Sequence, residues 1–315
     1  MPHSELLKDI KENMKRVMVG KAEVIDLLMV SMLCSGHVLL EDVPGLGKTV
    51  MAKSLAKSID GAFRRIQFTP DLLPSDVTGI NFYNQKEGDF HFRKGPVFCQ
   101  ILLADEINRA TPRTQSSLLE AMEEHQVTID GVTYPLEAPF MVIATQNPIE
   151  SQGTFPLPEA QLDRFFMKIS MGYPEMSEEI EILNRLMGTH PVDGLRAVRT
   201  VADLVEAQEA IKKVTISQDV LAYIVAIVQK TRNHPHIAIG ASPRGSIALM
   251  KGSKALAMLK GRDYVKPDDV KMLAPYVLSH RMTLDGAYVL SGEESGEFME
   301  RLLMDVAVPL ENSIA

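Results

Sequence analysis

Hydrophobic residues follow two patterns along the chain, and the change between them falls near residue 172. Before it, short apolar runs predict strands buried in a sheet, at 38–40, 63–68, 101–106, 140–144 and 165–170. Helical spacing in the same half predicts helices at 6–18, 50–56 and 114–124. Another predicted helix follows the break at 19–21 and ends at about residue 34. Later residues have helical spacing only, at 178–187, 201–212, 220–231, 246–259 and 267–278. The pattern predicts a parallel α/β sheet with flanking helices, followed by a smaller all-helical domain.

Turn-forming residues divide this plan further. Gly172-Tyr173-Pro174 interrupts the pattern, so we place the domain boundary between 1–172 and 173–315. Two hairpins are predicted within the first domain, at about 79–95 and 126–136, the second with the turn-favouring pair Asp130-Gly131. Residues 291–315 form a tail with some helical spacing, whose role the sequence leaves open.

A glycine-containing loop lies between the strand at 38–40 and the helix at 50–56. The N–H groups at the start of such a helix, with the positive end of its dipole, point at one position and bind phosphate. Lys48 would reach the β- and γ-phosphates of a nucleoside triphosphate, and the Thr49 hydroxyl would ligate magnesium. The candidate binding residues of this segment are Pro44, Gly45, Leu46, Gly47, Lys48, Thr49 and Val50. The general motif has glycine at position 42, where this chain has aspartate.

Two adjacent acids end the strand at 101–106. Asp105 would hold the magnesium ion, and Glu106 would orient and deprotonate an attacking water. The alternative is a solvated strand end, but adjacent acids directly after an apolar run are unusual surface chemistry. Together with the glycine loop, they predict an ATPase with ATP and Mg²⁺ as cofactors.

Composition narrows the classes of function. The net charge is −8 and the pI about 5.6, which argues mildly against broad nucleic-acid binding. No apolar run reaches transmembrane length, and the first residues lack the basic-then-apolar order of a signal peptide, so no membrane insertion is expected. Cys34 and Cys99 are isolated in apolar surroundings, which favours free thiols and a cytoplasmic location.

Five short motifs, in this order along the chain, resemble the MoxR group of AAA+ ATPases. They are Asp42-Val43-Pro44-Gly45-Leu46-Gly47-Lys48-Thr49, Asp105-Glu106-Ile107-Asn108-Arg109-Ala110, Ala144-Thr145-Gln146-Asn147-Pro148, Pro158-Glu159-Ala160-Gln161-Leu162-Asp163-Arg164-Phe165 and Ser242-Pro243-Arg244-Gly245. The resemblance covers about residues 4 to 290, and aspartate at position 42 is common in that group. It implies a P-loop NTPase core followed by a helical lid domain.

The resemblance also implies roles for individual residues. Asn147 would be the sensor that contacts the γ-phosphate and the attacking water, although Asn147-Pro148 would also suit a simple turn. Arg164 would be an arginine finger that reaches a neighbouring subunit's nucleotide, unless it only pairs with Asp163 or Glu159. Arg244 would be the second sensor, carried by the lid, and the sequence leaves open whether it acts within its own subunit or across the interface.

Val19 and Gly20 lie where the family packs the adenine ring, although they could equally be only a helix break.

The implied function is ATP-driven remodelling or maturation of a client protein by a homo-oligomeric ring, expected to be a hexamer. MoxR-like proteins often work with a separate partner that carries a von Willebrand factor A domain. Two alternatives remain, a nucleic-acid motor and an ATPase subunit of a metal chelatase. DNA-stimulated ATPase activity would favour the first alternative. The second would require partner subunits. The client, its pathway and the ring size are beyond the sequence.

Overall fold

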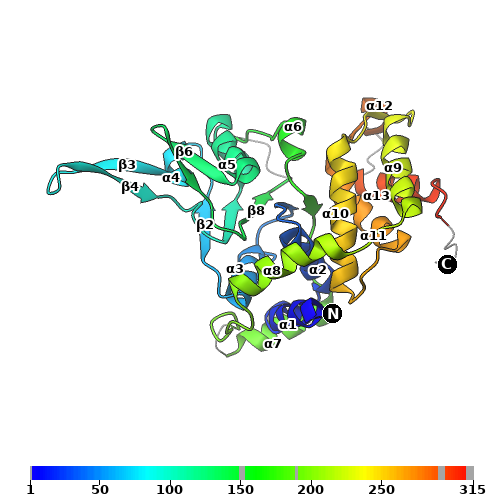
Figure 1. Ribbon diagram of the computed structural model, residues 1–315, viewed down its shortest axis with the longest axis horizontal. Coiled ribbons are helices and arrows are strands. Elements are labelled where there is room, and N and C mark those ends of the chain that lie inside the picture. Colours follow the sequence, from blue (N-terminus) through cyan, green and yellow to red (C-terminus); the bar gives the residue numbers. More distant parts are fainter. Residues whose placement is uncertain (1, 149–152, 189–190, 290–294, 310–315) are drawn as a thin grey trace.

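The structure is a computed structural model that describes residues 2–148, 153–188, 191–289 and 295–309. A sheet with flanking helices forms one part, and a group of helices packs beside it (Figure 1). No helix in the described ranges is long and apolar enough to cross a bilayer.

Five parallel strands form the central sheet, in the order β2-β5-β8-β1-β9. Their bounds are Val38–Glu41 (β1), Phe63–Gln67 (β2), Ile101–Asp105 (β5), Met141–Gln146 (β8) and Met167–Ile169 (β9). All five predicted strands are therefore present. The central strands β1, β5 and β8 begin with buried apolar residues, because helices cover both faces of the sheet, and each ends in a polar or acidic residue.

Alternate strand residues pack into two hydrophobic clusters, one on each face of the sheet. Leu40 and Leu103 belong to the cluster shared with α1 (Pro2–Lys15), α2 (Ala22–Leu33) and α3 (Lys48–Ser58). Leu39 and Leu102 belong to the other cluster, shared with α5 (Pro112–Glu124). The fold class expected from the sequence is confirmed. Two helices near the sheet were not expected because each is too short to show a helical period: α4 (Pro74–Thr78) and α6 (Glu159–Leu162).

Both predicted hairpins are present. They pair β3 (Gly79–Asn84) with β4 (Asp89–Lys94), and β6 (Gln126–Ile129) with β7 (Val132–Pro135). The β3–β4 hairpin projects from the body as an arm (Figure 1). The two hairpins touch near its base, where the rings of Phe92 and Tyr134 stack at 4.2 Å. The Asn81 amide also donates to Asp130 over 2.8 Å.

The second part is mainly helical. Its helices are α7 (Met176–Leu186), α8 (Val201–Ala210), α9 (Gln218–Arg232), α10 (Pro243–Leu259), α11 (Pro267–Leu278), α12 (Gly286–Val289) and α13 (Ser295–Met304). Single 3-10 turns lie at Ile211–Lys213 and Ser279–Arg281 of this part, and another, Ile107–Arg109, follows β5 in the first part. A two-stranded antiparallel pairing of β10 (Ile237–Ile239) with β11 (Thr283–Leu284) is also present and was not expected.

One hydrophobic cluster continues from the first part into the second. It contains Leu7 and Leu28 of the N-terminal helices, Leu249 of α10 and Leu273 of α11, all almost completely buried. Because the core is shared in this way, the domain boundary at 172 stays a prediction. The helices of the second part are thereby held beside the sheet by apolar packing.

Candidate nucleotide site

Polar residues gather in a pocket of about 390 Å³ at the carboxyl ends of the strands, the edge where open parallel sheets bind ligands. Several residues predicted from the sequence line it: Pro44, Gly45, Gly47, Lys48, Thr49, Val50, Asp105, Glu106 and Asn147. They come from three segments that follow β1, β5 and β8, which are adjacent in the sheet. The sheet thus brings together residues up to a hundred positions apart.

The loop after β1 has the conformation that its glycines permit. Gly45 has φ +88° and Gly47 has φ +86°, in the left-handed region that other residues rarely adopt. Gly47 is the N-cap of α3, so the first N–H groups of that helix face the pocket. The Lys48 ammonium donates to the backbone oxygen of Asp42 over 2.7 Å. Burial lowers the pKa of Lys48, and the nearby carboxylates act in the opposite direction.

Asp42 has a structural reason to replace the glycine of the general motif. Its buried carboxylate accepts hydrogen bonds from the Ser170 hydroxyl at 2.7 Å, the Met171 amide at 2.6 Å and the Gly172 amide at 3.2 Å. These residues follow β9 and lead toward α7. The side chain therefore ties the start of the phosphate loop to the segment that enters the helical part.

The two acids are held by neighbours that the sequence reasoning did not single out. Asp105 Oδ1 accepts from the Thr145 hydroxyl at 2.6 Å, and Oδ2 accepts from the Arg65 guanidinium at 2.6 Å. Glu106 Oε2 accepts from the Gln67 amide at 2.7 Å. Polar residues alternate along β2, but only the register, which pairs Gln67 with Asp105, shows that they reach the acids.

Glu106 has an unusual backbone conformation for a non-glycine residue. Its φ is 56°, in the left-handed region, which costs about 1–2 kcal/mol. Its amide donates to the Thr145 hydroxyl over 2.9 Å, so the contacts around the strand end hold the conformation. Strain of this kind is concentrated at functional sites, which is consistent with a directed role for this carboxylate.

The residues present fit a magnesium ion. The Thr49 hydroxyl and the Asp105 carboxylate line the same pocket and are hard oxygen donors. Within the described residues, no group of three or more His, Cys, Asp or Glu side chains could hold a metal ion. Mg²⁺ at nucleotide sites is typically bound by one or two side chains, with phosphates and waters as the other ligands.

A second pocket, of about 270 Å³, shares Gly45, Gly47 and Val50 with the first and is largely apolar. Val19, predicted to pack against the adenine ring, and Leu46 of the predicted phosphate loop line it, and so do Met18, Ile182 and Leu186, which the sequence reasoning did not name. Such a pocket can hold an apolar ring beside the phosphate pocket. Gly20 is not among its lining residues. Gly20 has φ +70°, a conformation that favours glycine, and a Cβ there would meet the carboxylate at the end of the Glu178 side chain in α7 at 1.9 Å.

The two predicted arginines lie elsewhere. Arg164 and Arg244 line a hollow of about 260 Å³ together with residues 34–37, which precede β1. Arg164 also precedes β9, so both arginines lie toward the amino ends of the strands. The four residues of β1 span about 13 Å. That length separates the arginines from the phosphate loop of their own chain.

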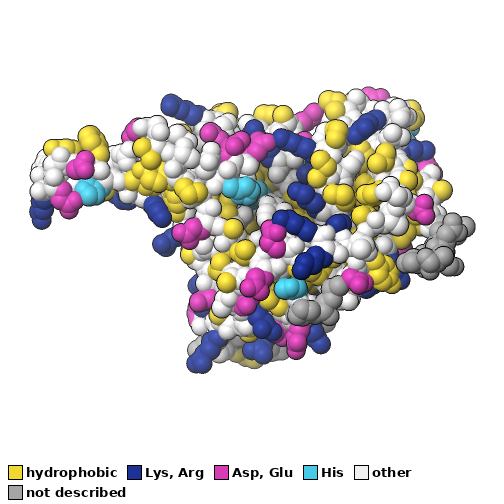
Figure 2. Space-filling model, viewed as in Figure 1, with side chains coloured by type: hydrophobic (Ala, Val, Ile, Leu, Met, Phe, Trp, Pro, Cys, Tyr) yellow, Lys and Arg dark blue, Asp and Glu magenta, His cyan; other side chains and the backbone are white. Residues whose placement is uncertain are grey.

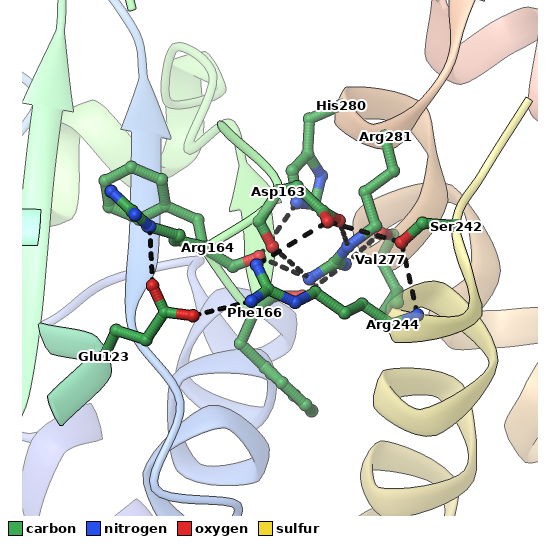
Figure 3. A network of polar contacts seen from close by, with 10 residues as sticks. Glu123, Asp163, Arg164, Phe166, Ser242, Arg244, Val277, His280 and Arg281 are labelled. Atoms are coloured by element: carbon green, nitrogen blue, oxygen red, sulfur yellow. Dashed lines mark hydrogen bonds and ion pairs between the residues drawn. The ribbon is translucent and has the colours of Figure 1, made fainter. Parts of the chain in front are cut away.

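Both arginines share one carboxylate (Figure 3). Arg164 Nε lies 2.8 Å from Glu123 Oε2, and Arg244 Nη2 lies 2.6 Å from Glu123 Oε1. In the described part of the chain, the ion-pair partner of Arg164 is therefore Glu123, and not Asp163 or Glu159 as the alternative prediction had it. Asp163 pairs instead with Arg281 at 2.8 Å, and more loosely with Arg244 at 3.9 Å.

Comparisons with known proteins agree with this architecture. A model described as "ATPase family associated with various cellular activities (AAA)" matches residues 37–167, and one described as "AAA lid domain" matches 229–302. A crystal structure from Cytophaga hutchinsonii, described provisionally as an ATPase, superposes with a TM-score of 0.92 and is 41% identical, covering 98% of this chain and 96% of that one. Fold and site therefore define an AAA+ ATPase, an enzyme that hydrolyses ATP.

Two relatives refine the family. The uncharacterized protein YeaC of Bacillus subtilis is 52% identical over 308 residues, covering 98% of this chain and 96% of the relative. The chaperone MoxR1 of Mycobacterium tuberculosis is 43% identical over 310 residues, covering 95% and 81%. The chain belongs to the MoxR family of AAA+ ATPases.

Proposed function

We propose that this protein is a ring-forming, Mg²⁺-dependent ATPase in which Arg164 and Arg244 complete the nucleotide site of a neighbouring copy. The supporting observation is their place at the amino ends of the strands, about one strand length from their own phosphate loop. A head-to-tail contact would bring the arginines of one copy to the pocket of the next, and repeated contacts of that kind close into a ring.

The pocket residues then have distinct tasks. The loop amides and Lys48 hold the β- and γ-phosphates. Thr49 and Asp105 would hold Mg²⁺, which when bound neutralises charge on the phosphate oxygens. Glu106 orients the attacking water and accepts its proton, while Asn147 contacts the γ-phosphate. The adenine ring occupies the apolar pocket beside Val19. Arginines of the neighbouring copy stabilise the charge of the transition state, a contribution of about 10³–10⁵ in rate for other NTPases.

Steady-state ATPase activity against protein concentration tests this arrangement. Specific activity should rise with concentration as copies assemble, and EDTA should abolish it. Arg164→Ala should lower hydrolysis strongly at every concentration while leaving the affinity for ATP nearly unchanged. Activity of a monomer, identified by light scattering and insensitive to Arg164→Ala, would contradict the shared site.

We further propose that the ring remodels a client protein and that the β3–β4 arm contacts it. Exposed aromatic side chains lie on this arm: Phe82 (46% exposed), Tyr83 (53%) and Phe90 (66%). Figure 2 shows hydrophobic side chains on its surface, away from the body of the protein. Exposed apolar groups of this kind mark interaction sites. The name of the mycobacterial relative, a chaperone, supports this choice. A separate partner with a von Willebrand factor A domain stays a prediction from the family.

A double variant of the arm, Phe82→Ser with Phe90→Ser, tests the client contact. Basal ATPase activity should stay within about twofold, because the arm is remote from the pocket. Any stimulation by a permanently unfolded polypeptide should be lost. Stimulation of the unmodified protein by DNA, and not by the polypeptide, would favour a nucleic-acid motor instead.

A further inference from the structure

Glu123 is the carboxylate that binds both arginines, and the ATPase chemistry described above does not yet use it. It lies in the last turn of α5, directly before the β6–β7 hairpin. Its two oxygens are divided between the partners, Oε2 toward Arg164 and Oε1 toward Arg244. Figure 3 shows the carboxylate between the two guanidinium groups. Without it, two like charges would face each other across the hollow.

The backbones that carry the arginines are fixed. Arg281, whose side chain is only 4% exposed, pairs with the Asp163 carboxylate at 2.8 Å and donates to the backbone oxygen of Phe165 at 2.6 Å. That clamp holds the segment on both sides of Arg164. Arg244 lies in the first turn of α10, where its amide donates to the Ser242 hydroxyl at 3.2 Å. Reorientation of either arginine therefore needs only a side-chain movement.

The ion pairs of Glu123 with Arg164 and Arg244 are weak enough for another anion to replace the carboxylate. The side chains of Glu123, Arg164 and Arg244 are 35%, 31% and 53% exposed, and ion pairs at such sites are weak because solvent screens them. A terminal phosphate has more charge and three acceptor oxygens, so it binds guanidinium groups more strongly than one carboxylate does. A phosphate delivered by a neighbouring copy can therefore replace Glu123.

We propose that Glu123 is a positioning residue that holds Arg164 and Arg244 together while no phosphate faces them, and releases them to the neighbouring copy's γ-phosphate. The proposal rests on the shared site proposed above. Glu123 competes with the phosphate, so its removal should favour productive contact between copies. At limiting protein concentration, hydrolysis should rise about two- to tenfold, as expected for the loss of two weak ion pairs.

A mixture of two inactive variants tests the direction of this effect. Lys48→Ala copies can only donate arginines, and Arg164→Ala copies can only supply a competent pocket, so activity arises where one faces the other. Glu123→Gln is then added to one variant at a time, and ATPase activity is measured at limiting concentration. The exposed neighbour Glu124→Gln is the matched control, and Glu123→Asp, which keeps the charge, should partly restore the original rate.

We expect Glu123→Gln to raise the rate only when it is carried by the Lys48→Ala copies, which donate the arginines. An equal change in either copy would show a general structural role and overturn the proposal. No change, or a lower rate in the arginine-donating copy, would also overturn it. If the mixture without Glu123→Gln is already inactive, the shared site itself fails, and the role of Glu123 fails with it.

Discussion

The carboxyl and amino ends of the same five strands carry different kinds of side chain. At the carboxyl ends, the glycine-containing loop, Lys48 and two acids line one pocket. At the amino ends, two arginines are occupied by a single glutamate. In the proposed mechanism, the first end binds the nucleotide and activates the attacking water, and the second stabilises the transition state in a neighbouring copy. Their separation supports our proposal that one copy contributes to two different nucleotide sites.

The largest effect should come from the acid at the carboxyl end. Glu106→Gln keeps the shape of the side chain but cannot accept a proton, so hydrolysis should fall about 10²- to 10⁴-fold while ATP still binds. Single-turnover hydrolysis and binding of a fluorescent ATP analogue separate the two steps. Glu124→Gln, on the surface of α5, should have little effect. Normal turnover by Glu106→Gln would remove this residue from catalysis.

Asp42 connects the pocket to the segment that leads to the helical part, and its loss should destabilise the protein. Asp42→Ala leaves the amides of Met171 and Gly172 without their acceptor, at a cost of about 3 kcal/mol in the free energy of unfolding. Asp42→Asn keeps one acceptor oxygen, so its free energy of unfolding should lie between those of Asp42→Ala and the unmodified protein. Urea unfolding measures both variants. Equal stability of Asp42→Ala and the unmodified protein would show that the connection contributes nothing.

At the amino ends, His37 should make stability depend on pH. Its Nδ1 accepts from the Val142 amide at 2.9 Å, so the neutral ring places its proton on Nε2, which faces the Met122 oxygen at 3.0 Å. Burial lowers the pKa of His37 to about 4, from an ordinary value of 6.5. The unfolded chain therefore binds the proton more readily. This contribution is fully present above about pH 6.5 and is lost as the pH falls toward 4.

The expected loss from His37 is about 2 kcal/mol in the free energy of unfolding between pH 7 and pH 5. His280, also buried with a lowered pKa, changes in the same direction. Urea unfolding at the two pH values measures the loss, and NMR of the His37 ring identifies the group. Titration of that ring near pH 6.5 in the folded protein would contradict the assignment.

The two ends also differ in how far the sequence predicts them. The phosphate loop and the acids are local motifs after apolar runs, so the sequence predicts the sheet strands and the hairpins, and it points to a loop whose residues line the pocket at the carboxyl ends. Arg65 and Gln67 could not, because their roles depend on the register of β2 against β5. Glu123 was also missed, since nothing in the spacing along the chain brings it to Arg164 and Arg244.

Very short helices and strands were a second kind of element that the sequence did not predict. The helix α6 and the β10–β11 pairing have too few residues to show a periodic pattern in the sequence. Gly20 has φ +70° and lies against the Glu178 side chain, and its place beside the adenine ring stays a prediction. The order of the motifs does not show whether Arg244 acts within its own copy or on a neighbour. Its place beside Arg164 supports our proposal that it acts across an interface.

The most direct test of a site shared between copies is the ATPase activity of Lys48→Ala and Arg164→Ala mixed in varying ratios at constant total protein. Each variant alone should be nearly inactive. An equal mixture should recover about a quarter of the unmodified activity, the share of random head-to-tail contacts that join an intact pocket to intact arginines. Activity should be highest near that ratio. No recovery at any ratio, with assembly of the mixture verified by light scattering, would contradict the account.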